Sequence, residues 1–229
     1  PFYYNQDLMF NRENKIAAEG IVYRNPKPHV RSRHAYFPWV VYTENGELIA
    51  SFVLAGAFES ADANTYTSRS VDNGITWSEP VPIIPSSEMI LRSNCARITD
   101  TGNGHLVTMM VRSDRSLYPE EGLANPENLG FVPTDLLLVH SFDNGRTWNK
   151  PDKIEPPLTG PSFEACSPVT VLTDGTWLWS TSTWRGWDGY CPNGMKMVGL
   201  LSRDEGKTWK EYLTAMDGSR EQVIYWEGK

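Results

Sequence analysis

The chain has 229 residues, with 28 acidic side chains against 21 Lys and Arg, which gives a net charge of −7. This length suffices for one domain with its own core. The acidic balance and the lack of any Lys/Arg-rich run argue against a nucleic-acid partner. No apolar run approaches the roughly 20 residues that a membrane-spanning helix needs.

The start of the chain and its cysteines leave the compartment open. The first ten residues lack the basic start and apolar stretch of a signal peptide. Because the chain begins with Pro1 rather than Met, we expect that an upstream segment has been removed. Three cysteines are an odd number, which excludes a complete disulfide framework. One bridge with one free thiol, and three free thiols, both remain open for Cys95, Cys166 and Cys191.

The first predicted unit spans about residues 31–85. Residues 37–52 (FPWVVYTENGELIASF) read as two strands joined at an Asn-Gly turn, which is typical of a β-hairpin. A third strand, NTYTSRS, leads through a second turn into a short fourth strand. Residues 1–30 precede this unit, and 16–23 (IAAEGIVY) are expected to form an outer strand.

The same order of strands and turns recurs twice along the chain. Residues 95–110 and 166–181 align with the first hairpin without gaps, and each carries its own Gly turn. The second and third units therefore span about residues 86–155 and 156–215.

The last residues, 221–229, resemble the beginning of a fourth unit. Since the chain stops inside a unit, we expect residues 1–229 to be a single, incomplete domain of a longer protein. Two half-rings that assemble by self-association are the alternative.

A second repeat lies between the third and fourth strands of each unit. It reads SVDNGITW at 70–77, SFDNGRTW at 141–148 and SRDEGKTW at 202–209. Asp can accept backbone N–H groups of its own turn, Gly permits positive φ, and Trp can fold back onto the hairpin. The repeated positions are thus expected to be structural: Ser70, Asp72, Gly74, Trp77, Ser141, Asp143, Gly145, Trp148, Ser202, Asp204, Gly206 and Trp209.

Four antiparallel strands, repeated along a chain, describe the blades of a β-propeller. The pattern Ser-x-Asp-x-Gly-x-Thr-Trp resembles the Asp box, or bacterial neuraminidase repeat, of the sialidase superfamily, and the resemblance covers about residues 35–212. It implies an all-β, sialidase-like propeller with six blades in the full protein, of which about three are present here. It also implies a glycosidase and an extracellular or periplasmic location.

Strand order divides the expected propeller into two faces. In an antiparallel blade, the tight Gly turn and the repeated turn lie at the same end. The variable loops and the beginnings of the first strands therefore share the other face, which by the resemblance holds the active site. These segments are rich in Arg, acidic and Trp residues. Arg binds carboxylates bidentately and Trp stacks on sugars, so we expect a carbohydrate partner that is anionic.

Two carboxylates are the catalytic candidates. Asp62, with Glu59 beside it, lies in the first variable loop, which in the family carries the acid–base Asp. Glu164 precedes the third hairpin, where the strand is expected to face the central channel. The alternative for both is an ordinary polar residue of a loop.

The chain departs from the family at the start of its first strand. Sialidases begin that strand with Arg-Ile-Pro, and alignment on Pro38 puts Tyr36 where the family has its substrate-binding Arg. Arg33 and His34 are close enough to replace that Arg. The other substrate-binding candidates lie in the loops and strand beginnings of the active-site face: Arg92, Asn94, Arg112, Asp114, Trp184, Arg185, Trp187, Asp188 and Glu227.

The sequence has no metal-ligand pattern, phosphate-binding loop or nucleophile elbow, so neither a metal nor a cofactor is expected. The main hypothesis is an exo-acting glycoside hydrolase of the sialidase-like superfamily that acts on an acidic glycan. The resemblance puts the nucleophilic Tyr and the later arginines in blades that this sequence does not contain. A polysaccharide lyase on uronic-acid polymers and a non-catalytic carbohydrate-binding propeller remain open alternatives.

Overall fold

The computed structural model describes residues 19–165, 167–192, 194–219 and 225, which form three antiparallel sheets. The first blade consists, in spatial order, of β1 (His34–Tyr42), β2 (Leu48–Ala55), β3 (Asn64–Ser70) and β4 (Val81–Pro82). After the 3-10 turn η2 (Ser86–Glu88), the second blade consists of β5 (Arg92–Asp100), β6 (Leu106–Asp114), β7 (Thr134–Ser141) and β8 (Asp152–Ile154).

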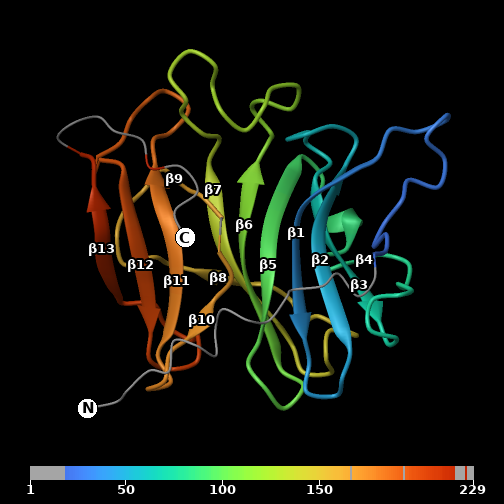
Figure 1. Ribbon diagram of the computed structural model, residues 1–229. Helices are drawn as coiled ribbons and strands as arrows, with labels where there is room; N and C mark the ends of the chain where they lie inside the picture. Colours follow the sequence, from blue (N-terminus) through green and yellow to red (C-terminus); the bar gives the residue numbers. More distant parts are fainter. Residues whose placement is uncertain (1–18, 166, 193, 220–224, 226–229) are drawn as a thin grey trace, which may run out of the picture.

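The third blade is built from β10 (Thr170–Val171), β11 (Trp177–Trp184), β12 (Lys196–Ser202) and β13 (Glu211–Asp217), and β9 (Ser162–Phe163) pairs with the far end of β11. Figure 1 shows the three sheets side by side, with the long loops at one end and the hairpin turns at the other. The prediction of three four-stranded propeller blades is confirmed.

Two details of the prediction need correction. The first strand of the third blade is not continuous, because among the described residues on this edge only β9 and β10 pair with β11. No strand occurs at residues 19–23, the described part of the expected outer strand; instead, Val22 and Tyr23 pack against Phe52. Of the expected start of a fourth unit, only Tyr225 lies within the described residues.

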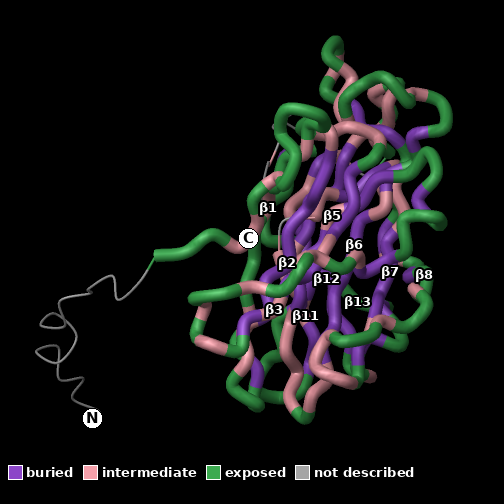
Figure 2. Tube along the Cα trace, turned by 90° about the vertical axis from the view of Figure 1, so that its right-hand side faces the viewer, coloured by how far each residue is buried: buried purple, intermediate pink, exposed green. Residues whose placement is uncertain are grey.

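The interfaces between blades hold the core. One cluster joins the first and second blades and includes Ile49, Ile98 and Leu106. Another joins the second and third blades around Trp177 and Trp179. Figure 2 shows the buried residues as bands along the strands, under exposed loops. Since each fully buried large apolar side chain contributes about 1.5–3 kcal/mol, these interfaces fix how the blades are placed around the site.

Side chains, rather than a strand ladder, close the inner seam between the second and third blades. Arg97 and Thr99 on β5 donate to the carbonyl oxygens of Ala165 and Val169, at 2.8 and 2.6 Å. From the third blade, the Phe163 backbone N–H donates to the Thr134 hydroxyl at 3.0 Å. These bonds satisfy backbone groups that the interrupted first strand of the third blade leaves without ladder partners.

The repeated turns have the expected hairpin geometry and lie at the end of the sheets away from the long loops. In the first turn, Ser70 Oγ donates to Asp72 and accepts from the Gly74 N–H, both at 2.8 Å. Gly74 has φ +87, which explains the Gly. Hydrogen bonds from Thr76 and Ser70 lower the pKa of Asp72 to about 2. The other two turns repeat the Ser–Asp and Gly–Ser bonds at 2.8–2.9 Å.

Two histidines form a direct pair on the face of the repeated turns. His105 Nε2 and His140 Nδ1 are 2.9 Å apart, and the two rings are stacked with Phe142. One nitrogen must carry the proton and the other must accept it. Burial lowers the pKa of His105, and burial together with the neighbouring His105 lowers the pKa of His140. The nearby carboxylates of Glu205, Asp100 and Asp152 oppose this shift only in part.

We expect His140→Gln to reduce the loss of unfolding free energy that occurs as the pH falls from about 7 to about 5. An unfolded histidine titrates near about 6.5, and the folded state favours the neutral pair. The unfolded chain therefore binds protons first, and the stabilisation is lost as the pH falls below that value. Denaturant unfolding at several pH values measures the slope, with His34→Gln, an exposed histidine of β1, as the control. An unchanged slope in His140→Gln would contradict the assignment.

Candidate functional site

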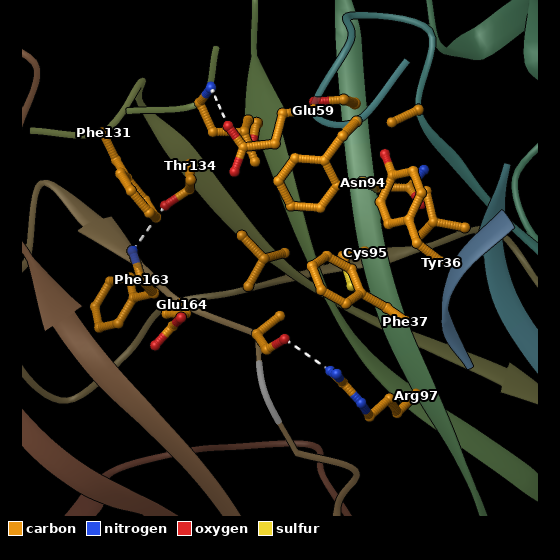
Figure 3. A pocket seen from close by; sticks show the side chains of 18 residues that line it. Tyr36, Phe37, Glu59, Asn94, Cys95, Arg97, Phe131, Thr134, Phe163 and Glu164 are labelled. Atoms are coloured by element: carbon orange, nitrogen blue, oxygen red, sulfur yellow. Dashed lines mark hydrogen bonds between the residues drawn. The ribbon is translucent and has the colours of Figure 1, made fainter. Parts of the chain in front are cut away.

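A cavity of about 220 Å³ opens on the face opposite the repeated turns. All three blades contribute to it: the beginning of β1, the β2–β3 loop, β5, the end of β6, the β6–β7 loop and the segment after β9. This is the face that strand order predicts for function. Its wall is mainly apolar, with carboxylate, guanidinium and hydroxyl groups at separate points (Figure 3).

An aromatic cluster forms the wall that the first blade contributes. The ring centroids of Tyr36 and Phe37 are 5.1 Å apart, and Phe58 lies 5.2 Å from Tyr36. A bulge between Tyr36 and Trp39, with Phe37 at φ +53, lets consecutive residues line the same cavity. Phe58 is 62% exposed, so this wall offers a ring face to a ligand.

The Tyr36 hydroxyl is a proton-bearing group. Burial raises the pKa of Tyr36 to about 12, against a hydrogen bond with the Glu59 backbone that lowers it. Tyr36 is therefore protonated at neutral pH and can donate a hydrogen bond, but it is a poor nucleophile. Unlike an arginine side chain, it carries no positive charge that could bind an anionic group.

Three ionisable side chains lie on different walls of the cavity. Glu59 comes from the β2–β3 loop, Glu164 follows β9, and Arg97 lies on β5 (Figure 3). The guanidinium of Arg97 lies 5.8 Å from the Phe37 ring centroid and donates to the Ala165 carbonyl. Among the described residues, no carboxylate forms an ion pair with Arg97. Its remaining N–H groups are suited to an anion in the cavity.

The backbone of Glu164 is fixed by the third blade. Its N–H donates to the Ser182 carbonyl at 3.1 Å, and its carbonyl accepts from the Thr181 hydroxyl at 2.6 Å. The predicted position of Glu164 at the channel therefore agrees with its place in the cavity wall.

Asp62 is placed differently from the sequence-based expectation. It is exposed and is not part of the cavity wall. Its two carboxylate oxygens accept from the Gly56 N–H at 3.0 and 3.1 Å, and one also accepts from the Ser60 hydroxyl. Although partial burial opposes it, these hydrogen bonds lower the pKa of Asp62. The Asp62 side chain thus stabilises the β2–β3 loop to which it belongs.

Asn94 is at the cavity but has its polar atoms occupied by the protein. Its Oδ1 accepts from both the backbone N–H and the hydroxyl of Thr65, each at 2.8 Å, and its Nδ2 donates to Asn64 at 2.7 Å. Since Asn64 and Thr65 belong to β3, Asn94 joins the first and second blades. The described hydrogen bonds give Asn94 a structural role, and its role in binding a ligand stays a prediction.

The charged candidates at the strand ends lie outside the cavity wall. Arg33 donates to the Tyr66 hydroxyl at 3.1 Å, and the exposed His34 hydrogen-bonds Ser32. Arg112 forms a 2.8 Å ion pair with its cross-strand neighbour Asp135. The exposed Arg92 and Asp114 are cross-strand neighbours at the ends of β5 and β6.

The two Trp candidates at the end of β11 and in the loop that follows it differ in burial. Trp184 is fully buried, stacks on Phe131 at 4.7 Å and donates to the Leu129 carbonyl at 2.6 Å, so it is a packing residue and not a ligand platform. Trp187 is half-buried and stacks on Tyr118 at 4.1 Å.

The two charged candidates of this loop, like the last candidate of the chain, are not at the cavity. Arg185 lines a second, separate hollow of about 280 Å³, and Asp188 caps the backbone of Tyr190. Glu227 lies outside the described residues.

Sequence reasoning did not select Arg97, Phe58 or Glu59 as site residues. A signal existed for Arg97, because it lies on the same strand as the candidate Asn94 and two residues after Cys95, and residues two apart on a strand share a face. No signal distinguished Glu59 from Asp62 in the same loop, since only the backbone conformation decides which side chain faces the cavity.

The described part of the chain holds no cluster of three or more His, Cys, Asp and Glu that could bind a metal ion. It also contains no helix long and apolar enough to cross a bilayer. Cys95 and Cys191 are free thiols, and burial raises the pKa of Cys95 to about 11, so this thiol in the cavity wall stays protonated.

No protein-family model and no curated protein matches this chain. Solved structures with a similar fold include a Hadza microbial sialidase, at 20% identity and TM-score 0.56 over 76% of this chain and 36% of that chain. A protein of unknown function from Dyadobacter fermentans DSM 18053 matches at 21% identity and TM-score 0.58, over 84% and 56%. The NanB sialidase from Streptococcus pneumoniae matches at 12% identity and TM-score 0.58, over 86% and 46%.

These likenesses show the fold, which is the sialidase-like β-propeller. The chain spans between 36% and 56% of the length of these three structures.

Proposed function

We propose that this chain forms part of a glycoside hydrolase of the sialidase-like kind that acts on an acidic glycan. The observation that carries the proposal is the convergence of three blades on one cavity, which brings together a carboxylate, a guanidinium that pairs with no carboxylate of the described residues, and an aromatic cluster with the exposed ring of Phe58. Aromatic faces suit the C–H surface of a sugar, and a guanidinium suits its acidic group.

Glu164 supplies the carboxylate of the third blade in this proposal. Carboxylates around a glycosidic bond can stabilise positive charge at the anomeric carbon or transfer protons. Its rigid backbone holds it on a wall of the same cavity as Arg97 and the aromatic cluster, so one bound sugar could contact all three.

The test is turnover of a panel of sialosides, uronides and neutral aryl glycosides by the intact protein. Hydrolysis of an acidic member, with a loss of about 100-fold or more in Glu164→Gln, is the expected result. Release of an unsaturated product from a uronic-acid polymer would replace the hydrolase with a lyase. Glycan binding without turnover of any member would replace it with a carbohydrate-binding propeller.

Arg97→Met is expected to weaken binding of an acidic glycan by about 10- to 100-fold, because a charge-assisted hydrogen bond contributes about 1.5–3 kcal/mol. Met retains much of the contact with Phe37 but cannot bind an anion. Calorimetry with an acidic glycan and its uncharged methyl ester measures the difference.

The matched variant Arg97→Lys keeps the charge without the planar fork, and we expect an intermediate loss. If Arg97→Met weakened binding of the acidic glycan and of its ester equally, Arg97 would have only a structural role, through its hydrogen bond to the Ala165 carbonyl.

A further inference from the structure

The backbone of Glu59 has an unusual conformation in the wall of the cavity. This non-glycine residue of the β2–β3 loop has φ +60, a left-handed value that side chains generally disfavour. Such conformations persist only where the surroundings over-determine them, and they cluster at functional sites. The contacts around Glu59 are therefore informative.

A buried arginine from the second blade fixes the main chain of Glu59. The Arg115 side chain is fully buried, and its Nη1 donates to the Glu59 carbonyl at 2.8 Å. Its Nη2 donates to the Glu121 carbonyl, so one guanidinium ties the β2–β3 loop to the β6–β7 loop. Burying a guanidinium costs desolvation energy, which its hydrogen bonds to the Glu59 and Glu121 carbonyls offset in part.

The carboxylate of Glu59 is fixed at one oxygen only. Its Oε2 accepts from the Leu123 N–H at 3.1 Å (Figure 3). Within the described part of the chain, Oε1 has no hydrogen-bond partner, and Glu59 contributes to the cavity wall. Asp62 differs in each respect, because both of its oxygens are bound by its own loop and it lies outside that wall.

We propose that Glu59 is the acid–base residue of this site and that Arg115 is its positioning residue. The inference rests on the proposed hydrolase function and names the group that performs its proton transfers. The role expected of Asp62 is thus assigned to Glu59, three residues earlier in the same loop. The carboxyl of Glu59 faces the same cavity as Glu164 (Figure 3).

The chemical step is a balanced hydrolysis. The protonated Glu59 carboxyl gives its proton to the glycosidic oxygen while the bond from this oxygen to the anomeric carbon breaks, and the electron pair of the bond stays on the leaving alcohol. Water then adds its oxygen to the anomeric carbon and returns a proton to the Glu59 carboxylate. One glycoside and one water thus become one sugar and one alcohol.

The first experiment compares Glu59→Gln with Asp62→Asn in the intact protein. Gln keeps the acceptor for the Leu123 N–H but cannot donate a carboxyl proton. We expect kcat/KM to fall at least 100-fold for glycosides with a poor alkyl leaving group, and less than 10-fold for an activated nitrophenyl glycoside that departs without protonation. Glu120→Gln, an exposed carboxylate of the β6–β7 loop, is the control.

The reverse pattern would overturn the assignment: a leaving-group-dependent loss in Asp62→Asn, with Glu59→Gln close to the wild type. An equal loss for both leaving groups in Glu59→Gln would also overturn it. If the wild-type protein hydrolyses no glycoside while it still binds a glycan, the proposed function fails, and this outcome is distinct from a failure of the Glu59 assignment.

The positioning role of Arg115 is tested by Arg115→Lys and Arg115→Met, each checked for folding by its unfolding midpoint. We expect Arg115→Met to lower kcat on the poor leaving group at least tenfold with little change in KM, and Arg115→Lys to recover part of that loss. A purely structural role would instead lower activity on both leaving groups equally, with no recovery in the Lys variant.

Discussion

Replacement of Trp184 by Ala is expected to lower the free energy of unfolding by about 4 kcal/mol, within the range measured for large aromatic residues in cores. Trp184 is fully buried, stacks on Phe131 and donates to the Leu129 carbonyl at 2.6 Å. Its removal leaves a cavity and an unpaired carbonyl. Because Phe131 also lines the cavity of the proposed glycan site, we expect weaker glycan binding as well.

Denaturant unfolding and glycan calorimetry measure the two effects of Trp184→Ala. Trp184→Phe keeps a ring against Phe131 and loses only the indole N–H, so it is expected to cost about 1 kcal/mol. Trp187→Ala serves as the matched control, because Trp187 is half-buried and stacks on a loop residue, Tyr118. If Trp184→Ala were no more destabilised than Trp187→Ala, the packing role would be wrong.

Replacement of Asn94 by Leu is expected to cost about 3 kcal/mol of stability. The substitution leaves the buried N–H and hydroxyl of Thr65, and the amide of Asn64, without their partner. Each unsatisfied buried group costs about 1–3 kcal/mol, and part of this is regained from the apolar contacts of Leu. Because the lost bonds join the first and second blades, the cavity between them should also become less ordered.

The unfolding midpoint and hydrogen exchange at Thr65 report on Asn94→Leu. The Thr65 amide, now protected by Asn94, should exchange faster in the variant. Arg92→Gln, an exposed position on the same strand, is the control and should shift stability by less than about 0.5 kcal/mol. Unchanged protection at Thr65 would show that Asn94 does not hold the two blades together.

The fold could be predicted because its signals are local and repeated. Each repeated turn contains its own Ser–Asp–Gly hydrogen bonds, and the Gly supplies the positive φ that the turn requires, as at Gly74. Three copies at corresponding places then define the blades. The order of the strands also predicted the face on which the cavity opens. An antiparallel blade places its tight turns at one end and its variable loops at the other, where the cavity lies.

The side chains of the site were less predictable because distant contacts decide them. Trp184 ends β11 just before a Gly-rich loop, and Leu129 and Phe131, more than fifty residues earlier, contact it. Asn94 shares its strand with Arg97, but its amide is taken by Thr65 of the neighbouring blade. Glu59 and Asp62 are carboxylates of one loop, and what distinguishes them is the left-handed backbone of Glu59 and the hydrogen bonds that each side chain makes.

The seam between the second and third blades links the shape of the cavity to side chains and not to strand pairing. Arg97, Thr99 and Thr134 bridge it through single hydrogen bonds to main-chain atoms, while the strand ladders lie elsewhere. Arg97 and Thr134 also line the cavity, so substitutions at these two positions are expected to change the shape of its wall while the strand registers of the blades stay as they are.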